Sequence, residues 1–260
     1  MQLADTQSGS SADARAFVVR LAKEALRHRA ANHVYLRAIG EGSLPDPAWA
    51  LRDFAVHYHA YSSHFPRFLT ALISRLENAE HRRALLANLT EESGTYSQEE
   101  LRELKAFGVD PDWINGVPHP QLFLRFCDAV DARPRSVVAD QALCWREMLL
   151  AVITHGTTAE ALGALGLGTE NIVRHIYQPF VQAIARSALA PRDAVFFPLH
   201  TAVDDHHQET LEDISTAFAL DEAGRAGLRR GMLKALALRS TFWDWLYERA
   251  LDPKRAEEAL

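Results

Sequence analysis

Three ionisable residues close to position 200 lie on what should be the buried face of one helix. Successive residues of an α-helix advance by about 100°, so spacing alone gives their relative directions. With His200 at zero, Asp204 falls at about +40° and His207 at about −20°, on the aliphatic stripe of the segment. Two imidazoles and a carboxylate arranged in this way suit Fe(II), Mn(II) or Zn(II). A solvated ion pair between residues four apart is the alternative interpretation.

Three other segments each direct one ionisable side chain toward an apolar face. Glu92 shares its stripe with the leucines three and seven residues before it, whereas Glu91 points about 120° away. Glu170 lies at the centre of the apolar stripe of the segment that follows it. His119 leads a segment whose inward residues are aliphatic and aromatic. Taken singly, each residue is better explained as a helix cap or as a hydrogen-bonded core residue than as a metal ligand.

The six residues together favour a metal site over six separate coincidences. A buried carboxylate without a partner is costly, so it protonates, forms an ion pair or coordinates a metal. Three carboxylates and three imidazoles are a sufficient set of ligands for two iron ions inside a helical bundle.

The elements that must position these residues are predicted to be helices. β-Branched residues never alternate over a full strand length, whereas helical periodicity recurs throughout. Glycines at 94, 108, 116, 156 and 166–168 fall between the periodic segments, where helices are expected to end. We therefore predict an all-α, single-domain bundle of about seven main helices over 1–260, with 1–12 as a disordered tail. The expected helices cover 11–29, 45–61, 65–76, 80–92, 98–107, 112–115, 122–130, 138–154, 170–187, 194–218 and 223–250.

Composition excludes several classes of protein. The chain has 28 Lys and Arg against 34 Asp and Glu, a formal charge of −6, and 48% hydrophobic residues. An acidic balance without a basic stripe argues against a nucleic-acid partner. Its apolar stretches are far shorter than the roughly 20 residues of a membrane span, and the N-terminus lacks the apolar core of a signal peptide. Cys127 and Cys144 match neither a disulfide framework nor a metal spacing, so we expect a cytoplasmic protein.

Four segments resemble the metal-binding segments of the heme-oxygenase-like diiron oxidases. The segment 197–207 resembles the last metal-binding helix of that family, and 88–94 resembles its first carboxylate helix. The segment 119–123 resembles its histidine-bearing helix, and Thr169-Glu170 its middle carboxylate. The resemblance spans about 15–250, and the stretch between Glu92 and His119 is longer than in many relatives. Thr169 stands where the self-sacrificing, p-aminobenzoate-forming members have Tyr, which disfavours that chemistry.

The resemblance implies a non-heme oxidase or oxygenase that uses two Fe(II) ions per chain and O₂ as co-substrate. The expected partners are a small organic substrate in a biosynthetic pathway, an external electron donor and a second copy in a homodimer. The expected reaction is N-oxygenation of an amine or oxidative cleavage of an amino or fatty acid. A non-enzymatic helical interaction or metal-holding protein is the alternative. The metal-binding and catalytic residues that the resemblance implies are Glu92, His119, Glu170, His200, Asp204 and His207.

Candidates for the substrate cavity are less specific. Tyr58, Phe65 and Trp145 are aromatic residues that could line it, although ordinary core packing explains them better. Arg146 and Arg174 could neutralise a substrate carboxylate, although solvated surface charges are more common.

Overall fold

The chain forms a bundle of helices joined by short loops. The computed structural model describes the backbone of residues 2–132 and 138–258, and the side chains of these residues except 2–10, 203–207 and 257–258. The fold is 78% helix, and the described residues contain no strand, which confirms the all-α prediction. In chain order the helices are α1 Gln2–Arg27, α2 Val34–Glu41, α3 Pro47–Ser62, α4 Phe65–Ile73, α5 Ala79–Glu92, α6 Gln98–Ala106, α7 Pro111–Ile114, α8 His119–Ala129, α9 Asp140–His155, α10 Thr158–Leu162, the π-helix η1 Gly163–Glu170, α11 Asn171–Ala185, α12 Phe196–Phe218, α13 Glu222–Leu251 and α14 Pro253–Glu258.

Several helices begin where a local side chain accepts a hydrogen bond from one of their first backbone N–H groups. Before α3, the Asp46 carboxylate accepts from the third helical N–H, at 2.9 Å, and Pro47 occupies the first helical position. Before α6, Ser97 and Glu100 form a reciprocal capping box. These caps explain why the sequence located most helix starts to within a few residues.

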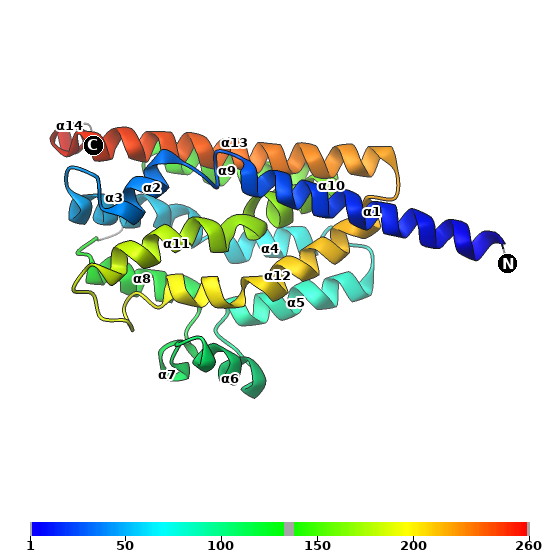
Figure 1. The fold of residues 1–260 in the computed structure, drawn as a ribbon, viewed down its shortest axis with the longest axis horizontal. Coiled ribbons are helices and arrows are strands. Elements are labelled where there is room, and N and C mark those ends of the chain that lie inside the picture. The colour runs from blue at the N-terminus through cyan, green and yellow to red at the C-terminus, as the bar shows by residue number, and fades with distance from the viewer. Residues whose placement is uncertain (1, 133–137, 259–260) are drawn as a thin grey trace.

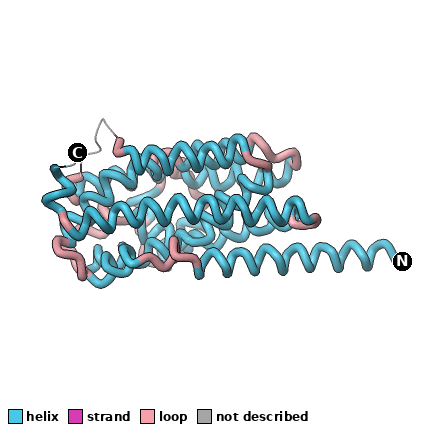
Figure 2. Tube along the Cα trace, turned by 90° about the horizontal axis from the view of Figure 1, so that it is seen from above, coloured by secondary structure: helices cyan, strands magenta, loops and turns pink. Residues whose placement is uncertain are grey.

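The helices pack lengthwise around one core, and a smaller unit projects from it. Helix α13 runs along one edge of the bundle. Helices α11 and α12 lie beside each other farther from that edge (Figure 1). Helices α6 and α7 project from the bundle between α5 and α8 (Figure 1). Helix α1 begins at Gln2, and its first turns, which include the segment expected to be a tail, run past the end of the bundle (Figure 2).

The glycine-rich segment at 163–168 does not end a helix, contrary to prediction. Helices α10, η1 and α11 follow one another without a break, and η1 has the wider π geometry. A Cβ at Gly163 would overlap the backbone carbonyl of Leu228, and one at Gly231 would overlap that of Glu160. The glycines therefore let α13 approach the backbone of α10 and η1 directly. π-Helices are rare and occur often at functional sites, and η1 ends at Glu170.

Helix α2 was not expected from the sequence. It has eight residues and begins after His33, whose side chain accepts from a backbone N–H of the first turn. Its Tyr35 is buried and stacks on Trp243 of α13, with 5.9 Å between ring centroids. A helix this short is stabilised mainly by such packing, which sequence periodicity does not reveal.

A column of aromatic rings fills the centre of the bundle. Phe54 of α3 stacks on Phe180 of α11 at 4.1 Å between centroids, and Phe180 stacks on Phe197 of α12 at 5.4 Å. Tyr58, one turn after Phe54, extends this column and directs its hydroxyl toward Tyr177. Offset aromatic pairs of this kind stabilise a core beyond their buried area alone and fix the helices that carry them.

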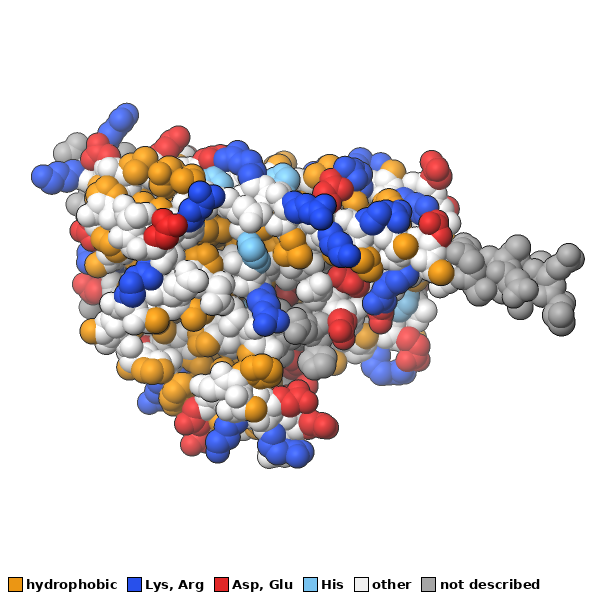
Figure 3. Space-filling model, viewed as in Figure 1, with side chains coloured by type: hydrophobic (Ala, Val, Ile, Leu, Met, Phe, Trp, Pro, Cys, Tyr) orange, Lys and Arg blue, Asp and Glu red, His pale blue; other side chains and the backbone are white. Residues whose placement is uncertain are grey.

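The surface carries mixed charge. On the face shown in Figure 3, basic and acidic side chains are interspersed and form no field of one sign. Among the described residues, no helix combines the length and the hydropathy needed to cross a bilayer.

Candidate metal centre

Four of the six predicted ligands line one cavity of about 30 Å³. Glu92 comes from the end of α5, His119 from the start of α8, Glu170 from the end of η1 and His200 from the first turns of α12. Four segments far apart in the sequence therefore converge. Asp204 and His207 also belong to α12, but their side chains lie outside the described residues.

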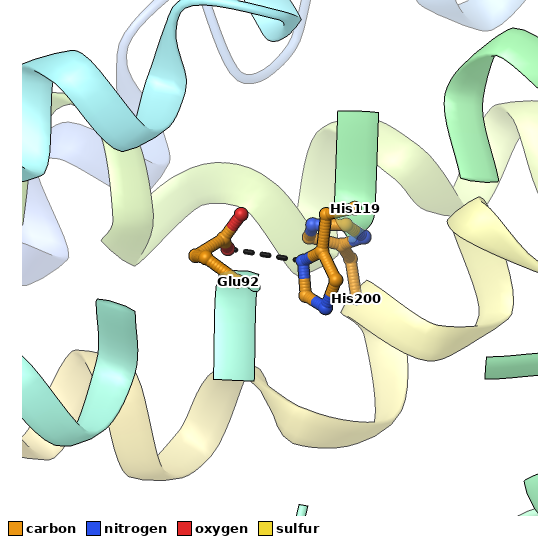
Figure 4. A group of neighbouring side chains, drawn as sticks. All are labelled: Glu92, His119 and His200. Carbon is orange, nitrogen blue, oxygen red and sulfur yellow. Dashed lines mark ion pairs between the residues drawn. The ribbon is translucent and has the colours of Figure 1, made fainter. Parts of the chain in front are cut away.

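Glu92, His119 and His200 lie closest together. One potential ligand atom from each lies within 4.8 Å of the other two, and the three side chains converge in Figure 4. Glu92 Oε1 is 3.0 Å from His119 Nδ1, and each residue is only 4% exposed. Glu91 is half-buried and does not line the cavity, as predicted from the rotation of about 100° per helical residue.

A backbone contact at the base of the α6–α7 projection brings Glu92 and His119 together. The Gly116 N–H donates to the Gly94 carbonyl at 2.8 Å, so the chain enters and leaves the projection at adjacent points. Gly94 has φ +83°, and a Cβ there would overlap the backbone of Val117. The long stretch between Glu92 and His119 therefore forms a projection whose two ends are adjacent. As a result, the end of α5 lies beside the start of α8.

The imidazole of His119 is oriented from its far side. The Tyr96 hydroxyl lies 2.6 Å from Nε2, and Tyr96 itself is buried. Nδ1 has no hydrogen-bond partner among the described residues, although Glu92 Oε1 is 3.0 Å away. Burial, and next the charge of Glu92, raise the pKa of Tyr96, so its hydroxyl stays protonated. The geometry suits a ring whose Nε2 is held by Tyr96 and whose Nδ1 lone pair faces Glu92.

The tautomer of His200 follows from its backbone contact. His200 Nδ1 is 2.7 Å from the carbonyl oxygen of Phe196, which can only accept a hydrogen bond. Nδ1 therefore carries the proton, and the lone pair of the neutral ring is on Nε2. Backbone contacts of this kind commonly orient metal-binding histidines.

These residues fit a metal ion. Nitrogen and oxygen ligands lie about 2.0–2.2 Å from a first-row metal ion, so two of them at a right angle are about 3 Å apart. The separation of 3.0 Å between Glu92 Oε1 and the orphaned His119 Nδ1 matches that value. Imidazole and carboxylate ligands are those that Fe(II), Mn(II) and Zn(II) share.

Hydroxyl groups and one guanidinium form another part of the cavity lining. The hydroxyls of Tyr58 and Tyr177 are 2.7 Å apart, and Arg239 Nη2 donates to the Tyr61 hydroxyl at 3.0 Å. Burial raises the pKa of both Tyr61 and Tyr177, which keeps these phenols protonated. The cavity therefore joins a carboxylate and imidazole region to a region rich in hydrogen-bond donors.

The structure sorts the residues considered for the substrate cavity. Tyr58 and Phe65 line it. Trp145 is buried behind it, stacked on Tyr61 at 3.7 Å between centroids. Arg146 pairs with the neighbouring Glu147, and neither Arg146 nor Arg174 lines the cavity.

Arg239 is the cavity residue that sequence reasoning missed. It is 1% exposed and lies on the buried stripe of α13, seven residues after Met232 and three after Leu236. The angular arithmetic that identified Glu92 would also have identified this guanidinium, because a charge on an apolar stripe is the same signal.

Comparison with solved structures places this architecture in the heme-oxygenase-like fold. A CADD-like protein of unknown function from Nostoc punctiforme superposes with a TM-score of 0.72, at 12% identity over 92% of this chain and 99% of that chain. A TenA homolog from Pseudomonas syringae pv. tomato gives 0.66, at 15% identity over 89% and 91%. A domain of unknown function with a heme oxygenase-like fold from Shewanella denitrificans gives 0.64, at 13% identity over 89% of each chain. At these identities the likeness concerns the fold alone.

The family is established by the sequence itself. The profile of the iron-containing redox enzyme family matches residues 52–240, a range that includes all four described ligand candidates and Arg239. The chain belongs to this family. Comparison with curated proteins gave no match.

Proposed function

We propose that this protein is a non-heme diiron oxidase or oxygenase that uses O₂ to oxidise a small organic substrate. The observation that carries the proposal is the buried Glu92–His119–His200 group in a chain of the iron-containing redox enzyme family. Glu170 lines the same cavity, and Asp204 and His207 follow His200 on the same helix. The proposed ligands of two Fe(II) ions are Glu92, His119, Glu170, His200, Asp204 and His207.

The surrounding residues would position the substrate and exclude bulk water. Bound iron would supply the electrons that reduce O₂ and the oxidising power that acts on the substrate. The phenols of Tyr58, Tyr61 and Tyr177 supply hydroxyls at the cavity wall, and burial keeps those of Tyr61 and Tyr177 protonated. The aromatic column behind them keeps water out, which strengthens polar interactions inside the cavity. The reaction proposed is N-oxygenation of an amine or oxidative cleavage of an amino or fatty acid.

Iron stoichiometry and O₂ consumption test the proposal. We expect the protein to bind about two Fe(II) per chain under anaerobic conditions and to consume O₂ faster than free iron does. Glu92→Gln removes a ligand charge and should lose at least one iron, whereas Glu91→Gln is the matched control and should keep both. Iron bound without O₂ consumption would instead favour a metal-holding protein. Equal iron loss in both variants would show that Glu92 is not a ligand.

A further inference from the structure

Besides His119 Nδ1, two buried polar atoms in the cavity lining have no hydrogen-bond partner among the described residues. They are Nη1 of Arg239 and Oγ of Ser62, whose residues are 1% and 8% exposed. Buried polar groups are almost always hydrogen-bonded, because an unpaired one retains its full desolvation cost. Two such atoms lining the same cavity therefore indicate a polar group that is absent from the protein itself.

Among the described residues, the guanidinium of Arg239 has no carboxylate counter-ion at ion-pair distance. Arginine remains protonated even when buried, and a buried cation is normally paired. Arg239 instead lies over the faces of Tyr61 and Trp145, with 5.3 Å and 4.9 Å from Cζ to the ring centroids. Within the described part of the chain it forms no ion pair with a carboxylate. The two carboxylates of the cavity, Glu92 and Glu170, are metal ligands under the proposed function.

The guanidinium is also fixed in orientation. Arg239 Nη2 donates to the Tyr61 hydroxyl at 3.0 Å, and the guanidinium also interacts with the Tyr58 side chain. These contacts hold the guanidinium in one orientation, and within the described part of the chain no group at hydrogen-bond distance satisfies Nη1. A donor that is already oriented loses little entropy when a ligand binds.

Ser62 adds a second donor from another helix. A serine near the end of a helix usually bonds the carbonyl four residues earlier, as Thr70 and Thr154 do in α4 and α9. The Ser62 hydroxyl makes no such bond, although α3 is regular up to this residue. One cationic donor and one neutral donor match the two oxygens of a planar carboxylate.

We propose that Arg239 and Ser62 form a subsite for the carboxylate of the substrate. This inference rests on the proposed function and narrows it to acids, so that a simple uncharged amine would not qualify. The cavity volume of about 30 Å³ favours a small group. The cavity already contains two carboxylates, so it suits a monoanion better than a doubly charged phosphate. The carboxylate would be held at Arg239 while the rest of the substrate extends toward Glu92 and His119.

Binding of small acids to the metal-free protein tests the subsite separately from iron chemistry. The probes are acetate, propionate and butyrate, with the amides of the same shape as neutral controls, all in the presence of a chelator. We expect the acids to raise the melting temperature and to titrate in calorimetry, and the amides to do neither. Equal binding of acids and amides would overturn the proposal.

Four variants assign the binding to the two residues. Ser62→Ala should weaken acid binding about tenfold, while Ser63→Ala, its exposed-side neighbour, should leave it unchanged. Arg239→Gln should abolish acid binding, with the exposed Arg174→Gln as its control. Since Arg239 is fully buried, the Ser62 pair keeps the test valid if Arg239→Gln fails to fold. Full acid binding by Ser62→Ala would overturn the assignment. Iron binding by the wild-type protein is measured in a separate experiment. A wild-type protein that binds small acids but no iron would reject the proposed function and leave the carboxylate subsite standing.

Discussion

The imidazole of His119 lies between the hydroxyl oxygen of Tyr96 and a carboxylate oxygen of Glu92, and the two contacts have different roles. Tyr96 approaches Nε2 at 2.6 Å, and Glu92 approaches Nδ1 at 3.0 Å without forming a hydrogen bond. The first contact holds the ring in one orientation, and the second leaves space for a metal ion. Tyr96 thus acts on the metal through His119 and is a positioning residue.

Tyr96→Phe tests this positioning role. The change removes one hydroxyl and leaves Nε2 of a buried imidazole unpaired, so the ring is no longer held in one orientation. We expect iron affinity to fall about 10- to 100-fold, the range typical of lost outer-shell partners, with little change in helix content. Iron titration with circular dichroism checks this, and Tyr247→Phe on α13 is the control. Unchanged iron affinity in Tyr96→Phe would contradict the role.

At the scale of elements, close packing of α13 against α10 and η1 sets the distance across the cavity. Glu170 comes from the end of η1, and Arg239 comes from α13. A Cβ at Gly231 would overlap the backbone carbonyl of Glu160, so these helices touch through their backbones. Any side chain at this point would move two lining residues of the cavity apart.

Gly231→Ala should therefore destabilise the protein although alanine favours helices. In an exposed helix the change would stabilise by up to about 1 kcal/mol, but overpacking against a backbone costs about 1–3 kcal/mol. We expect a net loss of about 2 kcal/mol in the free energy of unfolding, measured in urea. Leu233→Ala is the control on the same helix, because Leu233 is partly exposed. A Gly231→Ala variant as stable as the wild type would show that the helices can separate without cost.

At the scale of the whole molecule, the proposed iron site would connect four segments of the bundle. Its described ligand candidates come from α5, α8, η1 and α12, and α12 packs against each of the other three. A ligand that binds only the folded state stabilises it by mass action, by about 2.7 kcal/mol at 100 times its dissociation constant.

Fe(II) should accordingly raise the melting temperature by about 5–10 °C, since one kcal/mol corresponds to roughly 2–4 °C for a chain of this size. Anaerobic calorimetry measures the shift. Mg²⁺ prefers oxygen ligands and should give little shift, and His200→Ala should lose most of the effect of iron. The same shift in His200→Ala as in the wild type would place the bound iron elsewhere.

The sequence alone determined most of the helices and the inward direction of several polar residues on them. Both follow from local rules: caps and glycines set the ends, and a rotation of about 100° per residue sets the faces. This is why Glu92 was separated correctly from Glu91, and why Glu170, His119 and His200 were predicted to point inward. Arg239 could have been found in the same way, because it interrupts the apolar stripe of α13.

Only the tertiary structure decided which of these side chains meet. The contact between Gly94 and Gly116 brings Glu92 to His119, and the sequence gives no sign of that long-range pairing. It likewise gave no sign of Tyr96, whose partner is on another helix. The glycines before Glu170 were predicted to end a helix, because sequence shows the conformational freedom of glycine but not the backbone that packs against it. The distance between two packed helices depends on how well their surfaces fit, and these surfaces are far apart in the sequence. That distance is therefore set only when the whole core is assembled.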